Sequence, residues 1–172
     1  MTRPTKIVCV GRNYRDHAKE MGNDVPAEPL IFLKPPSSVI KDGDPIVLPP
    51  QSAQVEHEGE IGVVIGRTLR RVSSQEASTA VQAIVAANDV TARDLQRSDS
   101  QWTRAKGFDT FCPMGEVAKP PADLKTLTVV TRVNGVERQR GSAADMVFSI
   151  PDVLAYVSHI MTLEPGDLVL TG

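Results

Sequence analysis

The sequence lacks several features that would by themselves indicate a class of protein. No apolar run approaches the roughly 20 residues of a membrane-spanning helix, and the first residues lack the apolar segment of a secretory signal peptide. A glycine-rich phosphate loop, a dinucleotide-binding fingerprint and a Gly-x-Ser-x-Gly motif are also missing. The sequence therefore gives no indication of a membrane protein, a nucleotide-binding protein or an α/β-type serine hydrolase.

Cysteine and net charge are both scarce. Cys9 and Cys112 lie far apart and in no metal-binding or redox spacing, which favours a reducing cytoplasm as the location. The 19 basic and 21 acidic residues leave a net charge of −2. This charge gives no general electrostatic attraction to nucleic acid or to an anionic membrane, so we expect neither as a partner.

The composition is that of an ordinary globular protein. With 172 residues, 41% hydrophobic and 23% charged, the chain is long enough to bury the core of one domain. Short apolar runs predict strands at 6–10, 30–33, 46–48, 55–65, 81–90, 126–133, 136–140 and 168–170. Short helices are expected at 14–21, after 73, after 91 and from 150, whereas 98–116 is expected to be irregular. Asn134-Gly135 predicts a tight hairpin between two of the strands.

An acidic strand is the most informative segment. Glu56, Glu58 and Glu60 alternate before the apolar run 61–65. In an extended chain the three carboxylates lie on one face, with neighbours about 7 Å apart at Cα. Their repulsion can be relieved by a proton or by a divalent cation, for which oxygen ligands are suitable. A solvated acidic edge strand that binds no metal explains this segment equally well.

A second carboxylate position follows another apolar run. Asp89 comes near the end of the strand predicted at 81–90, where a buried carboxylate is costly unless it is paired or coordinated. We expect Thr91 to cap a helix that places Arg93 and Gln96 one turn apart near Asp89. Their planar groups with several donors are suited to holding a carboxylate or keto oxygen. A solvated helix is the alternative.

A histidine and a glutamate form a candidate catalytic dyad near the N-terminus. The helix expected at 14–21, capped by Asn13, places His17 and Glu20 at i and i+3. A carboxylate that orients an imidazole is suited to general-base catalysis, although an exposed ion pair gives the same pattern. Because breaker-rich residues follow at 22–29, the helix could move as a lid.

Seven motifs occur in one order along the chain. They are Gly11-Arg12-Asn13-Tyr14 with Asp16-His17, Phe32-Leu33-Lys34-Pro35, the segment 58–66, the segment 88–94, Lys106-Gly107-Phe108-Asp109, Phe148-Ser149-Ile150-Pro151, and Leu163-Glu164-Pro165-Gly166-Asp167 continuing to Leu170-Thr171-Gly172. Together they make the chain similar to the fumarylacetoacetate hydrolase family, in its short single-domain branch.

The resemblance implies an α+β, mainly β fold: a mixed β-roll or barrel-like sheet with short peripheral helices, forming one catalytic domain over residues 1–172. It also implies a bound Mg²⁺ or Mn²⁺. The implied residues are Glu58, Glu60 and Asp89 for the metal, His17, Glu20 and Lys106 for catalysis, and Arg93, Gln96 and Thr171 for the substrate. Family members continue past Leu170-Thr171-Gly172 into further strands, which residues 1–172 lack. Either the sequence is the ordered part of a longer protein or the gene product is truncated, and a native chain that ends here is expected to expose a sheet edge.

The implied activity is metal-dependent cleavage of a carbon–carbon bond in a small 2,4-diketo acid, such as an acylpyruvate or fumarylpyruvate, through a metal-bound enolate. Such chemistry belongs to aromatic catabolism, and a homodimer is expected. Oxaloacetate decarboxylation and isomerisation of 2-hydroxyhepta-2,4-diene-1,7-dioate are alternatives, because both share the enolate. A truncated, inactive, metal-binding homologue is the alternative that is not an enzyme.

Overall fold

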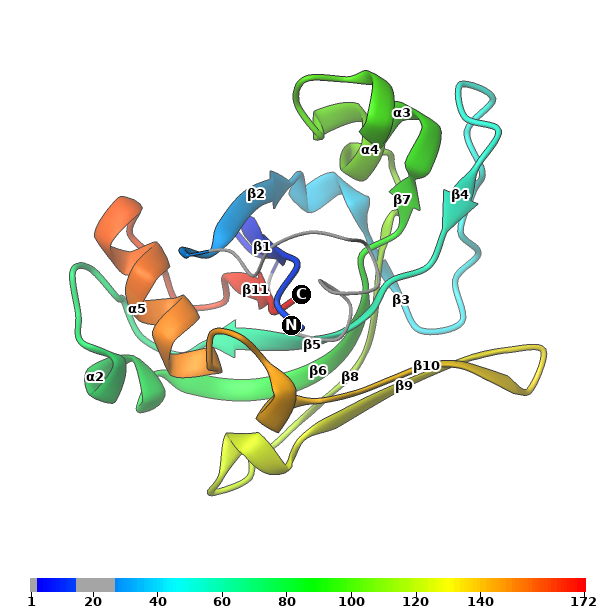
Figure 1. Cartoon of the computed structure of the whole chain (residues 1–172). Coiled ribbons are helices and arrows are strands. Elements are labelled where there is room, and N and C mark those ends of the chain that lie inside the picture. The colour runs from blue at the N-terminus through cyan, green and yellow to red at the C-terminus, as the bar shows by residue number, and fades with distance from the viewer. Residues whose placement is uncertain (1–2, 15–26) are drawn as a thin grey trace.

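One strongly curved sheet forms the body of the protein (Figure 1). The computed structural model describes residues 3–14 and 27–172. The seven strands of the sheet lie in the order β2-β1-β11-β5-β6-β8-β3. Their bounds are β1 Ile7–Gly11, β2 Leu30–Lys34, β3 Val39–Lys41, β5 Gly59–Ile65, β6 Val81–Asn88, β8 Cys112–Ala118 and β11 Leu168–Leu170. Two neighbouring pairs, β1 with β11 and β3 with β8, are parallel, and the other pairs are antiparallel.

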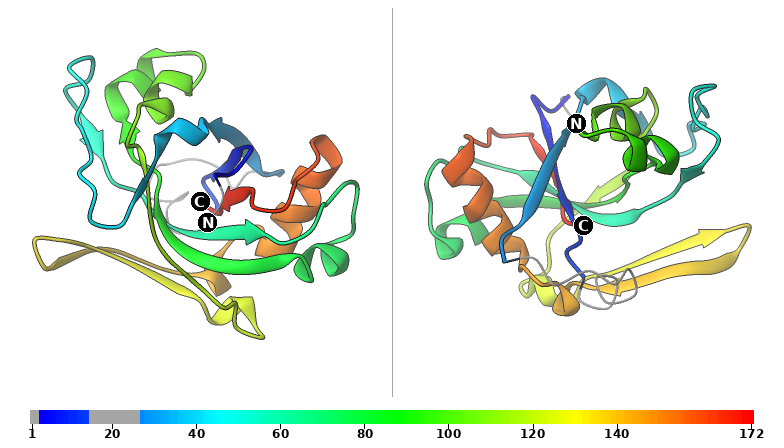
Figure 2. Two further views of the ribbon diagram at one scale, coloured as in Figure 1. Left: turned by 180° about the vertical axis from the view of Figure 1, so that it is seen from behind. Right: turned by 45° about the horizontal axis from the view of Figure 1, so that its top comes forward.

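Two smaller pairs of strands accompany the sheet. The hairpin of β9 (Thr128–Val133) and β10 (Val136–Ser142) lies outside the curve, beyond β5, β6 and β8 (Figures 1 and 2). Its turn has positive φ at Asn134 (51°) and Gly135 (79°), as the predicted Asn-Gly turn requires. The second pair joins β4 (Val55–Glu56) to β7 (Thr91–Ala92), next to the carboxylates of the candidate site.

Short helices flank the sheet. Helices α2 (Ser74–Ser78) and α5 (Ile150–Ile160) pack together at one end of the molecule, and α3 (Arg93–Ser98) and α4 (Thr103–Gly107) lie at the other (Figure 1). The 3-10 turns are η1 Pro36–Ser38, η2 Leu124–Thr126 and η3 Ala143–Asp145. The apolar stripe of α5 buries Val153, Leu154 and Val157 in the larger core. The mainly β fold with peripheral helices confirms the fold prediction.

Several local predictions were wrong. Residues 46–48 form no strand and are exposed, because the following prolines remove the N–H groups that a ladder needs. The region 98–116 is not irregular, since it contains α4 and the start of β8. Strand β11 lies inside the sheet between β1 and β5, and the edges of the described sheet are β2 and β3, so an edge left by absent C-terminal strands stays a prediction.

The predicted N-terminal helix is only partly open to comparison. Tyr14, expected as its first residue, instead forms an isolated antiparallel bridge with Met146. Residues 15–26 lie outside the described residues, and both His17 and Glu20 fall within this range. Among the helices that the structure describes, none is both long enough and apolar enough to cross a membrane.

Candidate metal and substrate site

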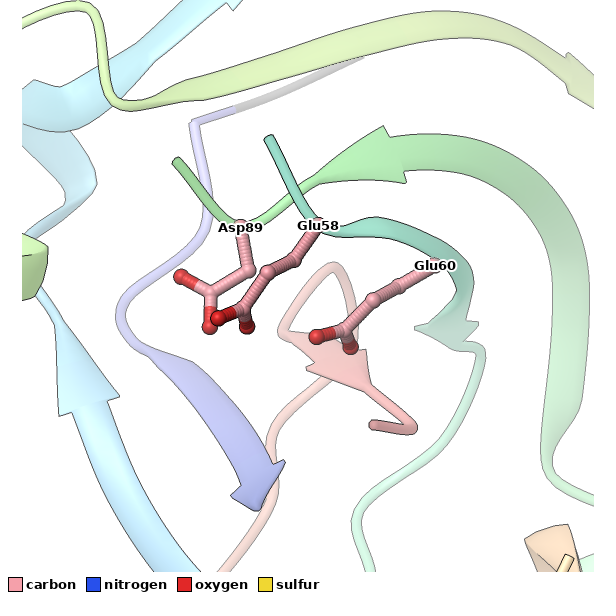
Figure 3. A group of neighbouring side chains, drawn as sticks. All are labelled: Glu58, Glu60 and Asp89. Atoms are coloured by element: carbon pink, nitrogen blue, oxygen red, sulfur yellow. The ribbon is translucent and has the colours of Figure 1, made fainter. Parts of the chain in front are cut away.

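Three carboxylates converge at the adjoining ends of two central strands (Figure 3). Glu58 directly precedes β5, Glu60 is its second residue, and Asp89 directly follows β6. The antiparallel register pairs Glu60 with Ala87, and the Asp89 N–H donates to the Glu58 carbonyl oxygen at 2.8 Å. One oxygen from each carboxylate lies within 4.8 Å of the others. The predicted convergence of these three residues is therefore present.

Asp89 is buried between two lysines. The Lys34 Nζ lies 2.7 Å from its Oδ1, and the Lys106 Nζ lies 2.5 Å from its Oδ2. Lys34 also donates to the carbonyl oxygen of Val90 at 3.2 Å. All three charged side chains are at most 2% exposed, so their ion pairs are shielded from solvent. The carboxylate that sequence analysis expected to be paired or coordinated has two ammonium partners.

Glu58 is held by cations on both of its oxygens. Lys106 lies 2.9 Å from Oε2 and Arg93 lies 2.5 Å from Oε1, while the Thr91 hydroxyl donates to Oε1 at 3.2 Å. Burial alone would raise the pKa of Glu58, but Lys106 and Arg93 outweigh burial, and the pKa lies below its usual value. Burial would lower the pKa of Lys106, but the carboxylates of Asp89 and Glu58 outweigh this effect and raise it.

Glu60 differs from its two neighbours. None of the ion pairs among the described residues includes it, and its Oε2 accepts a hydrogen bond from the Gly172 N–H at 2.7 Å. Burial, followed by the charges of Asp89 and Glu58, raises the pKa of Glu60 well above its usual value. A buried carboxyl group facing two carboxylates is stabilised by either a proton or a cation.

The arrangement fits a hard divalent cation of the kind that the resemblance implies. Three carboxylates supply oxygen ligands, which Mg²⁺ and Mn²⁺ prefer. Glu60 is the member of the set whose charge has no basic partner among the described residues. The residues present therefore fit the metal, and Glu58, Glu60 and Asp89 are the groups that would hold it.

Arg93 and Gln96 share one face of α3, as predicted. The Arg93 Nη1 donates to the Gln96 Oε1 at 2.8 Å, and its Nε donates to Glu56 at 2.8 Å. Glu56 is thereby placed at the exposed rim, outside the carboxylate cluster. The prediction that Thr91 caps α3 was wrong. Ala92 occupies the N-cap position, and the Thr91 hydroxyl donates to the Asp89 carbonyl oxygen.

Thr171 is fully buried at the end of β11. Its hydroxyl donates to the Ile61 carbonyl oxygen at 2.9 Å, and its N–H bonds to the same oxygen. These bonds extend the pairing of β11 with β5 and bring the N–H of Gly172 to Glu60. Substrate contact by Thr171 stays a prediction.

Sequence analysis missed two site residues. Lys34 ends β2 and is fully buried against Asp89. The feature of the sequence that could have indicated this role is a lysine at the end of an apolar run, directly before Pro35-Pro36. Asn13 was expected to cap a helix. The backbone groups that it would cap lie outside the described residues; its amide donates to the Thr171 and Phe148 carbonyl oxygens and accepts from the Phe148 N–H, contacts that no local pattern indicates.

Comparison with known proteins identifies the family. Residues 6–172 match the family described as fumarylacetoacetate (FAA) hydrolase C-terminal. The chain belongs to this family. It is 46% identical to the human mitochondrial oxaloacetate tautomerase over 177 residues, covering 100% of this chain and 56% of that protein. It is 44% identical to the mitochondrial oxaloacetate decarboxylase of Dictyostelium discoideum over 174 residues, covering 97% of this chain and 80% of the relative.

A solved structure gives the same result. The 5-carboxymethyl-2-hydroxymuconate delta-isomerase of Mycobacterium smegmatis matches with a TM-score of 0.90 and 43% identity, covering 99% of this chain and 68% of that structure. The resemblance inferred from the seven motifs is thus confirmed at the level of sequence and of fold. The named family members are enzymes, and their names span tautomerisation, decarboxylation and isomerisation.

Proposed function

We propose that this family member is a divalent-metal-dependent enzyme that acts on a small 2-keto acid through keto–enol chemistry, with oxaloacetate as the first substrate to test. The single observation that carries the proposal is Glu60, buried against Glu58 and Asp89 without a basic partner among the described residues. The names of relatives at 44–46% identity support oxaloacetate over the acylpyruvates favoured by sequence analysis alone.

Each part of the described site has a role in this proposal. A Mg²⁺ or Mn²⁺ held by Glu58, Glu60 and Asp89 would supply Lewis-acid stabilisation of the negative charge that develops on the substrate. Lys34 contacts the far side of Asp89 and fixes the direction in which this carboxylate points. Lys106 places an ammonium group beside the same cluster, where it can donate to a developing oxyanion.

Arg93 supplies the orientation of the substrate in our proposal. Its guanidinium is anchored by Glu56, Glu58 and Gln96, so its plane is fixed at the rim of the site. The Arg93 Nη2 takes part in none of the described contacts, so this nitrogen can donate to a substrate carboxylate, which favours a dicarboxylate such as oxaloacetate. We also propose a homodimer in the cytoplasm, for which light scattering in solution is the test of the oligomeric state.

Hydrolysis of an acylpyruvate is the second candidate, favoured by the predicted His17–Glu20 dyad. Hydrolysis needs a base that deprotonates water. Oxaloacetate instead loses the carboxylate that is β to its keto group, so the electron pair of the breaking bond passes into an enolate and no nucleophile is needed. A positioned histidine contributes about 10²–10⁴-fold to such a proton transfer. His17→Ala should therefore suppress acetylpyruvate cleavage by that factor and reduce oxaloacetate decarboxylation much less. Equal rates for the variant and the parent on acetylpyruvate would remove His17 as the base.

The decisive experiment compares isosteric variants after metal removal. Protein treated with a chelator is assayed for oxaloacetate tautomerisation, oxaloacetate decarboxylation and acetylpyruvate cleavage, before and after Mg²⁺ or Mn²⁺ is added. We expect Glu60→Gln to lose metal binding and activity, and Glu116→Gln, an exposed change on β8, to retain both. Turnover that persists without metal, or a Glu60→Gln enzyme as active as the parent, would overturn the proposal.

A further inference from the structure

A side chain from the outer hairpin completes the hydrogen bonding of the strand that carries Glu58 and Glu60. Gln139, on β10, is 80 positions away from Gly59 in the sequence. Its Oε1 accepts from the Gly59 N–H at 2.9 Å, and its Nε2 donates to the Gly59 carbonyl oxygen at 2.6 Å. One amide group therefore binds both backbone polar groups of the residue between the two carboxylates.

The geometry of β5 explains why Gly59 needs such a partner. Successive residues of a strand direct their N–H and C=O groups to opposite sides. The Glu58 carbonyl oxygen faces β6, where it accepts from the Asp89 N–H, so the polar groups of Gly59 face away from β6. On that other side, β11 pairs with Gly62 to Val64, and Thr171 reaches only Ile61. Gln139 occupies the place that one more strand residue would fill.

The packing around Gly59 fixes this arrangement. A Cβ on Gly59 would lie 1.9 Å from the Thr131 Oγ1, so only glycine allows the hairpin to approach this closely. The Thr131 hydroxyl also donates to the Gln139 Oε1 at 3.2 Å and so orients the amide. A register shift between Glu137 and Gln139 interrupts the β9–β10 ladder at this point. Such bulges re-aim a side chain, here toward Gly59.

We propose that Gln139 is a positioning residue that holds Glu58 and Glu60 at the spacing required for metal binding. Glu58 and Glu60 share one face of the strand, and the hairpin packs against Gly59 on the opposite face. The Asn88 side chain accepts from the Glu58 N–H at 2.9 Å, so the backbone on either side of the Glu58–Gly59 peptide is fixed by side chains. This inference rests on the proposed metal-dependent function.

The test uses Gln139→Met, which keeps the length of the side chain and removes both hydrogen bonds. Arg138→Met, an exposed neighbour on the same strand, is the matched control. Groups that orient metal ligands typically contribute 10- to 100-fold to affinity, so we expect the Mg²⁺ dissociation constant of Gln139→Met to rise by at least 10-fold. Activity should return toward the parent kcat at saturating Mg²⁺, because Gln139 does not contact the reacting atoms.

Hydrogen exchange supplies a second readout that needs no metal. The amides of residues 57–61 should exchange faster in Gln139→Met than in Arg138→Met and the parent. Unchanged Mg²⁺ affinity together with unchanged exchange would overturn the role of Gln139 and leave the proposed function intact. If the parent binds neither Mg²⁺ nor Mn²⁺, the proposed function fails, and exchange alone decides whether Gln139 fixes the strand.

A milder variant covers the case in which Gln139→Met does not fold. Thr131→Val keeps the shape of the side chain and removes only the hydrogen bond that orients the Gln139 amide. It should shift Mg²⁺ affinity and local exchange in the same direction as Gln139→Met, by a smaller factor. Parent values for both quantities in a folded Thr131→Val protein would count against the inference.

Discussion

Loss of the Asp89 charge should destabilise the metal-free protein strongly, because it leaves the Lys34 ammonium buried without a carboxylate. Lys34 and Asp89 are 0% and 1% exposed in their side chains, and the ion pair has a separation of 2.7 Å. Lys106 keeps a second partner in Glu58, whereas Lys34 has only Asp89 among the described ion pairs. Asp89→Asn retains the shape and one acceptor oxygen, so its cost arises mainly from the unpaired charge.

The expected magnitude follows from the burial of the pair. Removing one partner of a buried ion pair costs about 3–5 kcal/mol. We place Asp89→Asn within this range: its amide oxygen still accepts a hydrogen bond from Lys34, but its NH₂ group then faces the Lys106 ammonium, donor against donor. Since 1 kcal/mol corresponds to roughly 2–4 °C for a domain of this size, Tm should fall by about 10 °C. Lys34→Met should cost less, because Asp89 keeps Lys106 as its partner.

The assay is urea unfolding at pH 7 with a chelator present, for the two single variants and for the double variant Lys34→Met/Asp89→Leu. The double variant removes both charges, so it should recover part of the stability lost in Asp89→Asn. Asp109→Asn, an exposed change, is the control and should shift the free energy of unfolding by less than about 0.5 kcal/mol. If Asp89→Asn matches this control, the buried pair does not stabilise the fold in the way argued here.

Two further predictions concern titration and thiol chemistry. Because burial, Asp89 and Glu58 raise the pKa of Glu60, a proton competes with the metal, and Mg²⁺ affinity should increase as pH rises above 4.5. Calorimetry in buffers of different ionisation enthalpy should detect the proton that metal binding releases. A Mg²⁺ affinity that does not change with pH would contradict this. In the metal-free protein the same raised pKa gives a stability contribution that is complete below the unfolded value of about 4.3 and is lost as pH rises through the folded value. Burial raises the pKa of Cys112 to about 12 and the pKa of Cys9 well above its usual value. A thiol reagent should therefore label both cysteines only after the protein is unfolded in urea. Rapid labelling of the folded protein would contradict this prediction.

Local patterns in the sequence were sufficient for the elements whose formation depends on neighbouring residues. The alternation at 58–60 and the apolar run after it predicted β5, and Asn134-Gly135 predicted the hairpin, because side-chain period and turn conformation are local properties. The helix beginning at 150 followed from its apolar stripe in the same way. The strand predicted at 46–48 was wrong because this short run has no pairing strand among the described residues, and the prolines that follow it remove the N–H groups that a ladder needs.

The sequence by itself determined the acidic residues of the site, since Glu58, Glu60 and Asp89 each stand at the end of a strand that local patterns identify. Tertiary structure alone decided what surrounds them. Lys34 reaches Asp89 because β2 and β6 belong to the same curved sheet, and Gln139 reaches Gly59 because the hairpin folds back over β5. Both contacts join residues more than 50 positions apart, whose approach depends on strand order and register. Periodicity and spacing record only local preferences, so they contain no signal for either contact.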